Sequence, residues 1–171
     1  MTKRGVLLPF LILLSVPAVG TAAPRVVAAS GAWAALGGPT ACEAASRALQ
    51  PAANGQVQAR AGIAFDAAPG GRRGQLALHL GHVPRPGSTV MLTVGEVPFL
   101  LVSRGDWAWS RGPAQEAAII AAMRSADGMR VEARSPGGGR YTDRFDLTGA
   151  PTAIDAAAAC ALGLAKSRPL P

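Results

Sequence analysis

Alternation of apolar and polar side chains with a period of two is the feature that most constrains the fold of this chain. It runs through residues 57–65, 76–80, 90–94, 129–133 and 141–147. Such alternation is typical of strands that bury one face and expose the other. The segments between these stretches are rich in Gly and Pro, the residues that favour tight turns. The sequence therefore predicts a mainly β, antiparallel, sandwich-like domain.

The second half of the chain adds a hairpin and a first helix to this prediction. Residues 136–139 read Pro-Gly-Gly-Gly and separate the last two alternating stretches, which indicates a β-hairpin. Pro113 precedes residues 114–126, where it suits the first position of a helix, and Gly128 is placed to end that helix. Glu116 lies near the helix start, where the helix dipole favours a negative charge.

A second short helix is predicted at the C-terminus. Pro151 opens residues 152–162, and Gly163 is the expected stop. The side chains on one stripe of this helix should face the sheet; they are Ala153, Ala157, Cys160 and Leu164.

The first residues of the chain have the three regions of a secretory signal peptide. Lys3 and Arg4 precede an apolar run over residues 6–19, which small residues follow. The run contains two prolines and is shorter than the ~20 residues that cross a bilayer as a helix. We therefore expect residues 1–22 to be cleaved, leaving no transmembrane segment, and the protein to be periplasmic or secreted. No cysteine at the junction offers a lipid-attachment site.

The mature chain is expected to form one domain. Residues 23–166 fit a single β-rich domain, and the proline-containing residues 167–171 are expected to form a disordered tail. The net charge of the chain is +7, but its basic residues are scattered singly apart from the leader and the pair Arg72 and Arg73. Nucleic-acid-binding proteins gather such residues on one face. We therefore expect no nucleic-acid partner.

Two cysteines, Cys42 and Cys160, remain after the leader. In an oxidising compartment an isolated pair is most simply a disulfide, and two free thiols are the alternative. Hydrophobic residues make up 49% of the chain, but many are Ala, which buries little area. The core should therefore be thin, and a bond that closes so long a loop would stabilise it.

Two stretches resemble a known family. Gly31, Ala32 and Trp33 follow soon after the leader, a cysteine follows them, and residues 141–156 resemble a terminal strand, turn and helix. Together these features are similar to the invasion-associated locus B family, whose members are small exported proteins, found mainly in alphaproteobacteria and not known as enzymes. The resemblance covers most of the mature chain and implies a link to virulence.

The departures from the family pattern indicate a divergent branch. Ala32 stands where the family has Asp, Pro151 stands where Phe is common, and a further cysteine pair that many members carry in mid-chain is absent. The family has no established catalytic residues to transfer, so the resemblance bears on fold and location more than on chemistry.

No residue cluster in the sequence predicts a metal, a cofactor or catalysis. His79 and His82 fall on opposite faces of a regular strand and have no further ligand beside them. Asp143 and Asp146 also face opposite sides, and Arg144 between them indicates surface charge pairing. The common serine-nucleophile motifs are absent, and a disulfide leaves no free thiol.

The remaining candidates are aromatic and loop residues. Residues 104–106 spell Arg-Gly-Asp, which we interpret as a hairpin turn rather than an adhesion motif. Trp107 and Trp109 share one face of the strand that follows. Aromatic pairs of this kind most often belong to a core, but exposed pairs mark binding surfaces. They are the candidate binding surface of this chain.

These observations favour a non-enzymatic binding or envelope-associated module. The expected partner is a protein or envelope component, and the resemblance implies roles in host-cell interaction or envelope stress tolerance. The alternative is an exported hydrolase with an unrecognised active site. Neither the ligand nor the oligomeric state is indicated by the sequence.

Overall fold

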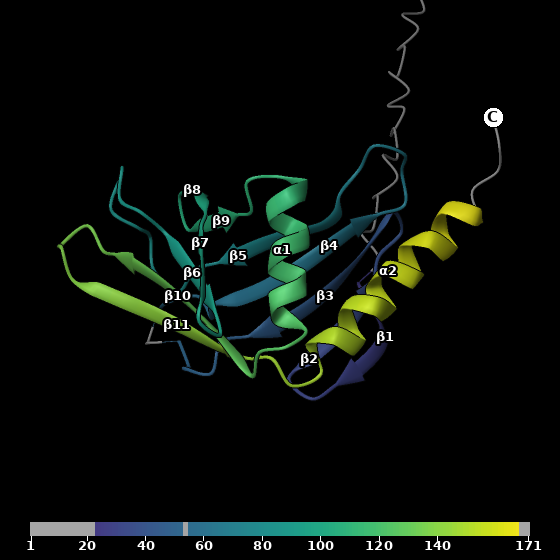
Figure 1. Cartoon of the computed structure of the whole chain (residues 1–171), viewed down its shortest axis with the longest axis horizontal. Coiled ribbons are helices and arrows are strands. Elements are labelled where there is room, and N and C mark those ends of the chain that lie inside the picture. The colour runs from purple at the N-terminus through teal and green to yellow at the C-terminus, as the bar shows by residue number, and fades with distance from the viewer. Residues whose placement is uncertain (1–22, 53–54, 168–171) are drawn as a thin grey trace, which may run out of the picture.

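Two antiparallel sheets and two helices make up the protein (Figure 1). The computed structural model describes residues 23–52 and 55–167 of the 171 residues. The predicted signal peptide, residues 1–22, lies outside the described residues, and so do residues 168–171 of the predicted tail. Ser167, the first residue of that predicted tail, caps the last helix instead.

Seven strands form the larger sheet, in the spatial order β1 (Arg25–Ser30), β2 (Trp33–Gly37), β3 (Ala41–Arg47), β4 (Arg60–Asp66), β5 (Arg73–His79), β9 (Trp107–Trp109) and β8 (Val102–Arg104). Four strands form the smaller sheet, in the order β11 (Arg140–Asp146), β10 (Gly128–Arg134), β6 (Met91–Val94) and β7 (Val97–Leu100). The helices are α1 (Pro113–Met123) and α2 (Ala150–Lys166).

The period-two alternation is confirmed as the pattern of the core. Leu76 and Leu78 of β5 are fully buried, as are Leu92 of β6 and Val131 of β10. The predicted hairpin is also confirmed, because β10 and β11 pair directly. The fold class, a mainly β, antiparallel, sandwich-like domain with two helices, is as the sequence predicted.

The predicted strand over residues 57–65 begins later than expected. Strand β4 starts at Arg60, and Val57 is 58% exposed. The cause is Gln58, whose side chain donates hydrogen bonds to the carbonyls of Ala48 and Gln50 and accepts one from the amide of Ala52. These bonds hold residues 57–58 in a loop, because a side chain that binds nearby backbone groups competes with strand pairing.

The first helix ends earlier than predicted. It stops at Met123 rather than at Ala126. Backbone hydrogen bonds explain the difference, because Asp127 accepts one from Leu147 and Gly128 accepts one from Gly95. Residues 127 and 128 are thereby already bound to the smaller sheet, and Gly128 opens β10 instead of ending the helix.

The second helix is longer than predicted at both ends. It runs through Gly163, which lies exposed and costs a helix only about 1 kcal/mol relative to Ala. The helix ends where the amide and hydroxyl of Ser167 both donate to the carbonyl of Gly163. The predicted inward stripe is correct for Ala153 and Ala157, which are fully buried, whereas Cys160 and Leu164 are half-buried.

A disulfide between Cys42 and Cys160 joins β3 to α2, as predicted. The two Cα atoms lie 6.1 Å apart, within the normal range for such a bond. The helix packs on β1 to β4 chiefly through small side chains, Ile154 being the large exception. Because Ala buries little apolar area, the disulfide contributes much of the stabilisation that keeps α2 packed on the sheet.

The turn between β1 and β2 contacts the segment that leads into α2. The amide of Ala32 donates to the carbonyl of Thr148 at 2.9 Å, and the indole Nε1 of Trp33 donates to the carbonyl of Asp146 at 2.8 Å. Gly31 and Gly149 have φ angles of 55° and 84°. A Cβ on either residue would overlap the opposing backbone, so the close approach requires glycine at both positions.

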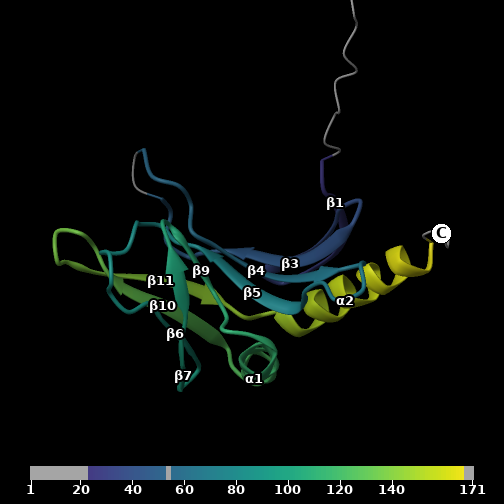
Figure 2. The same ribbon diagram turned by 90° about the horizontal axis from the view of Figure 1, so that it is seen from above.

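Among residues 23–52 and 55–167, helices and strands cover only one face of the larger sheet. Figure 2 shows α1, α2 and the smaller sheet all lying on the same side of β2 to β5, with no element across the opposite, concave side. We call this second side the outer face. Among residues 23–52 and 55–167, no helix is long and apolar enough to cross a membrane.

Replacing Cys160 tests how much the disulfide stabilises the fold. We expect Cys160→Ser to lower the free energy of unfolding by about 2–5 kcal/mol, because the unfolded chain gains entropy and α2 loses its anchor. Urea unfolding followed by circular dichroism measures the change. Ala159→Ser, at an exposed position of the same helix, is the matched control and should change stability by less than about 0.5 kcal/mol. Equal unfolding midpoints for the two variants would refute the expectation.

Candidate functional site

The outer face of the larger sheet has a floor of small residues. The strand register aligns Ala45, Gly62, Ala77 and Trp109 in one row across β3, β4, β5 and β9. The first three of these residues have a methyl side chain or none, so the surface is low over β3 to β5. It rises at Trp109 of β9. A hollow of about 600 Å³ lies at this rise, and Ala64, Ala77 and Trp109 are among the residues that line it.

Trp107 and Trp109 form the raised side of this hollow. Both are half-buried and project to the outer face, whereas Ala108 between them is fully buried on the inner one. Their rings are nearly parallel, with 12° between the planes and 6.3 Å between centroids. The sequence placed them correctly on one face, and that face is the uncovered one.

A chain of polar contacts crosses the outer face beside these rings. The Glu43 carboxylate lies 3.9 Å from the guanidinium of Arg60, which lies 5.7 Å from the Trp107 ring centroid. His79 of the neighbouring strand β5 also contacts that ring, at 4.7 Å between centroids, and its Nε2 is 2.9 Å from Asp106. These contacts fix the orientation of the Trp107 ring.

Gly62 makes the position of Glu43 possible. A Cβ at residue 62 would overlap the Glu43 carboxylate, which lies flat across the sheet toward β4. The absence of a side chain at Gly62 therefore decides where this negative charge sits. Sequence reasoning missed this arrangement, because it depends on the pairing of β3 with β4.

The two histidines have different surroundings, because β5 ends at His79 and His82 lies in the segment beyond it rather than on the same strand, as the sequence had suggested. His79 contacts Trp107, whereas His82 is exposed and stacks on Tyr141 at 4.9 Å between centroids. Within the described residues, no group of three or more His, Cys, Asp or Glu side chains is arranged to hold a metal ion.

The Arg-Gly-Asp segment is a hairpin turn, as predicted. Arg104 ends β8 and pairs with Trp107 of β9, and Gly105 has the positive φ of 59° that such a turn requires. The carboxylate of Asp106 is engaged by His79 rather than presented at a loop tip.

Asp143 and Asp146 point to opposite sides of β11, as predicted, but Arg144 pairs with neither. In the part of the chain that the structure describes, Arg144 has no carboxylate within 4.0 Å, and its backbone amide donates to Gln50 instead. Asp143 is buried and accepts a hydrogen bond from the amide of Gly81. Burial raises the pKa of Asp143 and outweighs the opposing effects of that hydrogen bond and of His82.

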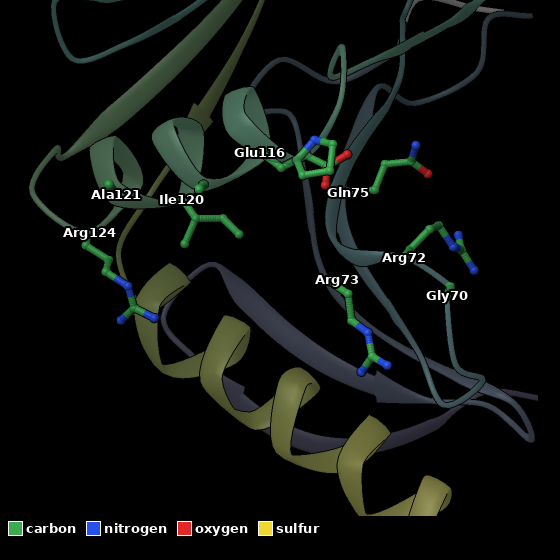
Figure 3. A pocket seen from close by; sticks show the side chains of 11 residues that line it. Gly70, Arg72, Arg73, Gln75, Glu116, Ile120, Ala121 and Arg124 are labelled. Carbon is green, nitrogen blue, oxygen red and sulfur yellow. The ribbon is translucent and has the colours of Figure 1, made fainter.

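A second hollow, of about 670 Å³, lies between α1 and the turn that joins β4 to β5 (Figure 3). Arg72 and Arg124 on its rim are paired with Asp66 and Asp155, respectively. Arg73 is exposed and projects between α1 and α2.

Glu116, which lines this hollow, and Ser110 are the nearest approach to a hydrolytic arrangement among the described residues. Glu116 is buried and accepts a hydrogen bond of 3.2 Å from the hydroxyl of Ser110. The sequence indicated only that Glu116 lies near the helix start, where the helix dipole favours a negative charge. Its contact with Ser110 was not predicted. Activation of a serine requires a base, usually imidazole, and Ser110 is itself buried. The pair is therefore better explained as a polar contact that ties α1 to the end of β9.

The chain matches no protein-family model, no curated protein and no solved structure.

The buried carboxylate of Asp143 predicts a pH-dependent stability. Because its folded pKa is raised above about 3.9, folding takes up a proton and this contribution to stability is lost as pH rises above that value. The free energy of unfolding of the wild type should therefore fall relative to that of Asp143→Asn between pH 4 and 7. Urea unfolding at several pH values measures the difference.

Asp146→Asn is the matched control for this experiment. A hydrogen bond from Thr148 lowers the pKa of Asp146, so its contribution is lost as pH falls below about 3.9, the opposite direction. Parallel stability curves for the wild type and Asp143→Asn would contradict the assignment of a raised pKa to Asp143.

Proposed function

We propose that this protein is an exported, non-enzymatic binding module whose ligand surface is the outer face of the larger sheet. The observation that carries the proposal is the pair of parallel tryptophans above a floor of small residues, on a face that no helix or strand of the described residues covers. Indole rings left half-exposed on a concave surface are typical of ligand contact, because they offer large rigid area together with a polar N–H group.

The covalent structure supports the export part of this proposal. Disulfides persist in oxidising compartments and are rare in the cytosol. The bond between Cys42 and Cys160 therefore fits the signal peptide that the first 22 residues resemble, and it favours a periplasmic or secreted protein.

Divergent membership of the invasion-associated locus B family is part of the same proposal. The two stretches that carry the resemblance contact each other, through Ala32 and Thr148 and through Trp33 and Asp146. A motif whose separate pieces touch is one structural unit, which supports a shared fold more than a shared ligand. The roles in host-cell interaction or envelope stress tolerance are proposed on this resemblance alone.

Binding to isolated envelopes of a Gram-negative bacterium tests the proposal. The mature protein should sediment with envelopes, and Trp107→Ala with Trp109→Ala should weaken binding at least about tenfold, or about 1.4 kcal/mol. The matched control is Val97→Ala with Leu100→Ala, at exposed positions of β7 in the smaller sheet. Wild-type affinity of the tryptophan variant, or an equal loss in the control, would disprove the assigned surface.

Oxidative footprinting of the wild type gives the same test without a substitution. Trp107 and Trp109 should react with a tryptophan-specific oxidant in the free protein and be protected by envelopes. Trp33, which is 1% exposed, is an internal control and should stay unreacted in both states. Equal oxidation of the paired tryptophans with and without envelopes would count against the proposal.

A further inference from the structure

A row that contains three arginines, His79 and Trp107 crosses the outer face. The strand register places Arg47 opposite Arg60, Arg60 opposite His79, His79 opposite Trp107, and Trp107 opposite Arg104. Directly paired residues share a face, so all five belong to the outer one. The row spans five strands, or about 19 Å at the usual strand spacing. Its arginines looked scattered in the sequence because they come from three separate strands.

Two arginines of this row, Arg47 and Arg104, are not neutralised by the described residues around them, whereas His79 contacts Asp106. Within the described residues, Arg47 and Arg104 have no carboxylate within 4.0 Å and are exposed. Glu43 lies 3.9 Å from Arg60, a long contact that only partly offsets that charge. Like charges directly opposite on a sheet are destabilising, so the pairing of Arg47 with Arg60 costs stability in the free protein. An anion bound along the row would remove that cost.

The groups beside the row fit a hydroxyl-rich ligand. Glu43 and Gln75 line the hollow next to the tryptophans and offer acceptors and an amide donor to hydroxyl groups. The C–H face of a sugar ring packs on an indole ring, and the two half-buried tryptophans offer indole surface for such contacts. Guanidinium groups bind carboxylates with paired hydrogen bonds.

We infer that the outer face binds an acidic polysaccharide, an extended chain of sugar rings that carry carboxylate groups. This inference rests on the proposed function, since it names the ligand of the same surface. Trp107 and Trp109 contact the ring faces, Arg47, Arg60 and Arg104 pair with the carboxylates, and Glu43 and Gln75 bond hydroxyl groups.

A nucleic acid fits this surface less well. A phosphodiester chain such as DNA has few hydroxyl groups for acceptors to bind. Glu43 and Asp106 lie along the row and can accept hydrogen bonds from sugar hydroxyls, which such a chain hardly offers. The mixture of cations and acceptors therefore favours the polysaccharide.

Binding of defined oligosaccharides to the purified mature protein tests this inference. The probes are an oligogalacturonate, a neutral malto-oligosaccharide of equal length and an oligothymidylate, each measured by calorimetry at low and moderate salt. We expect the oligogalacturonate to bind most tightly, and raising the salt to weaken it, because exposed charge pairs are screened.

Variants of the row sharpen the test. Arg47→Gln, Arg60→Gln and Arg104→Gln together should weaken oligogalacturonate binding about tenfold or more, the loss expected for charge-assisted hydrogen bonds. The matched control replaces three exposed arginines near one end of the smaller sheet, Arg85→Gln, Arg134→Gln and Arg140→Gln, and should change affinity less than about twofold.

Three results would overturn the inference: no binding of the oligogalacturonate, tighter binding of the oligothymidylate, or equal losses in the two triple variants. Each is distinguishable from failure of the proposed function. If the tryptophan variant loses envelope binding while no oligogalacturonate binds, the outer face remains the ligand surface and only the ligand class is wrong.

Discussion

The contact between Gly31 and Gly149 is the constraint on which the rest of the structure depends. At this point the turn after the first strand meets the turn before the last helix, so closely that neither residue has room for a Cβ. Hydrogen bonds from Ala32 and Trp33 lie on one side of the contact, and the disulfide between Cys42 and Cys160 lies farther along the same helix. The two ends of the folded domain are thereby held together (Figure 1).

This closure determines which face of the larger sheet is free. With α2 held against β1 to β4, and α1 with the smaller sheet packed beside it, the apolar side chains of the large sheet are buried on one side. The other side keeps a floor of small residues, two tryptophans and a row of arginines. A thin, Ala-rich core is sufficient for such a fold because covalent and backbone contacts hold its edges. The outer face is then free for the binding that we propose, because the core does not depend on it.

The sequence predicted what depends on local pattern and missed what depends on strand pairing. The alternation around Leu76 and Leu78 identified the core, and the isolated pair of Cys42 and Cys160 identified the disulfide. Helix ends were less well predicted, because Gly163 is tolerated inside α2 and the end of α1 is set by hydrogen bonds to the smaller sheet. The arginine row was not predicted, because the register that aligns Arg47 with Arg60 cannot be derived from the sequence of either strand alone.

The unfolding free energy of Gly149→Ala tests the central claim that this contact holds the domain together. The claim predicts a loss of more than about 1 kcal/mol, because alanine is strained at a positive φ and its Cβ overlaps the carbonyl of Ser30. Gly163→Ala, at an open helical position of the same helix, should instead raise stability by about 0.5–1 kcal/mol. An unfolding midpoint for Gly149→Ala equal to that of the wild type would contradict the claim.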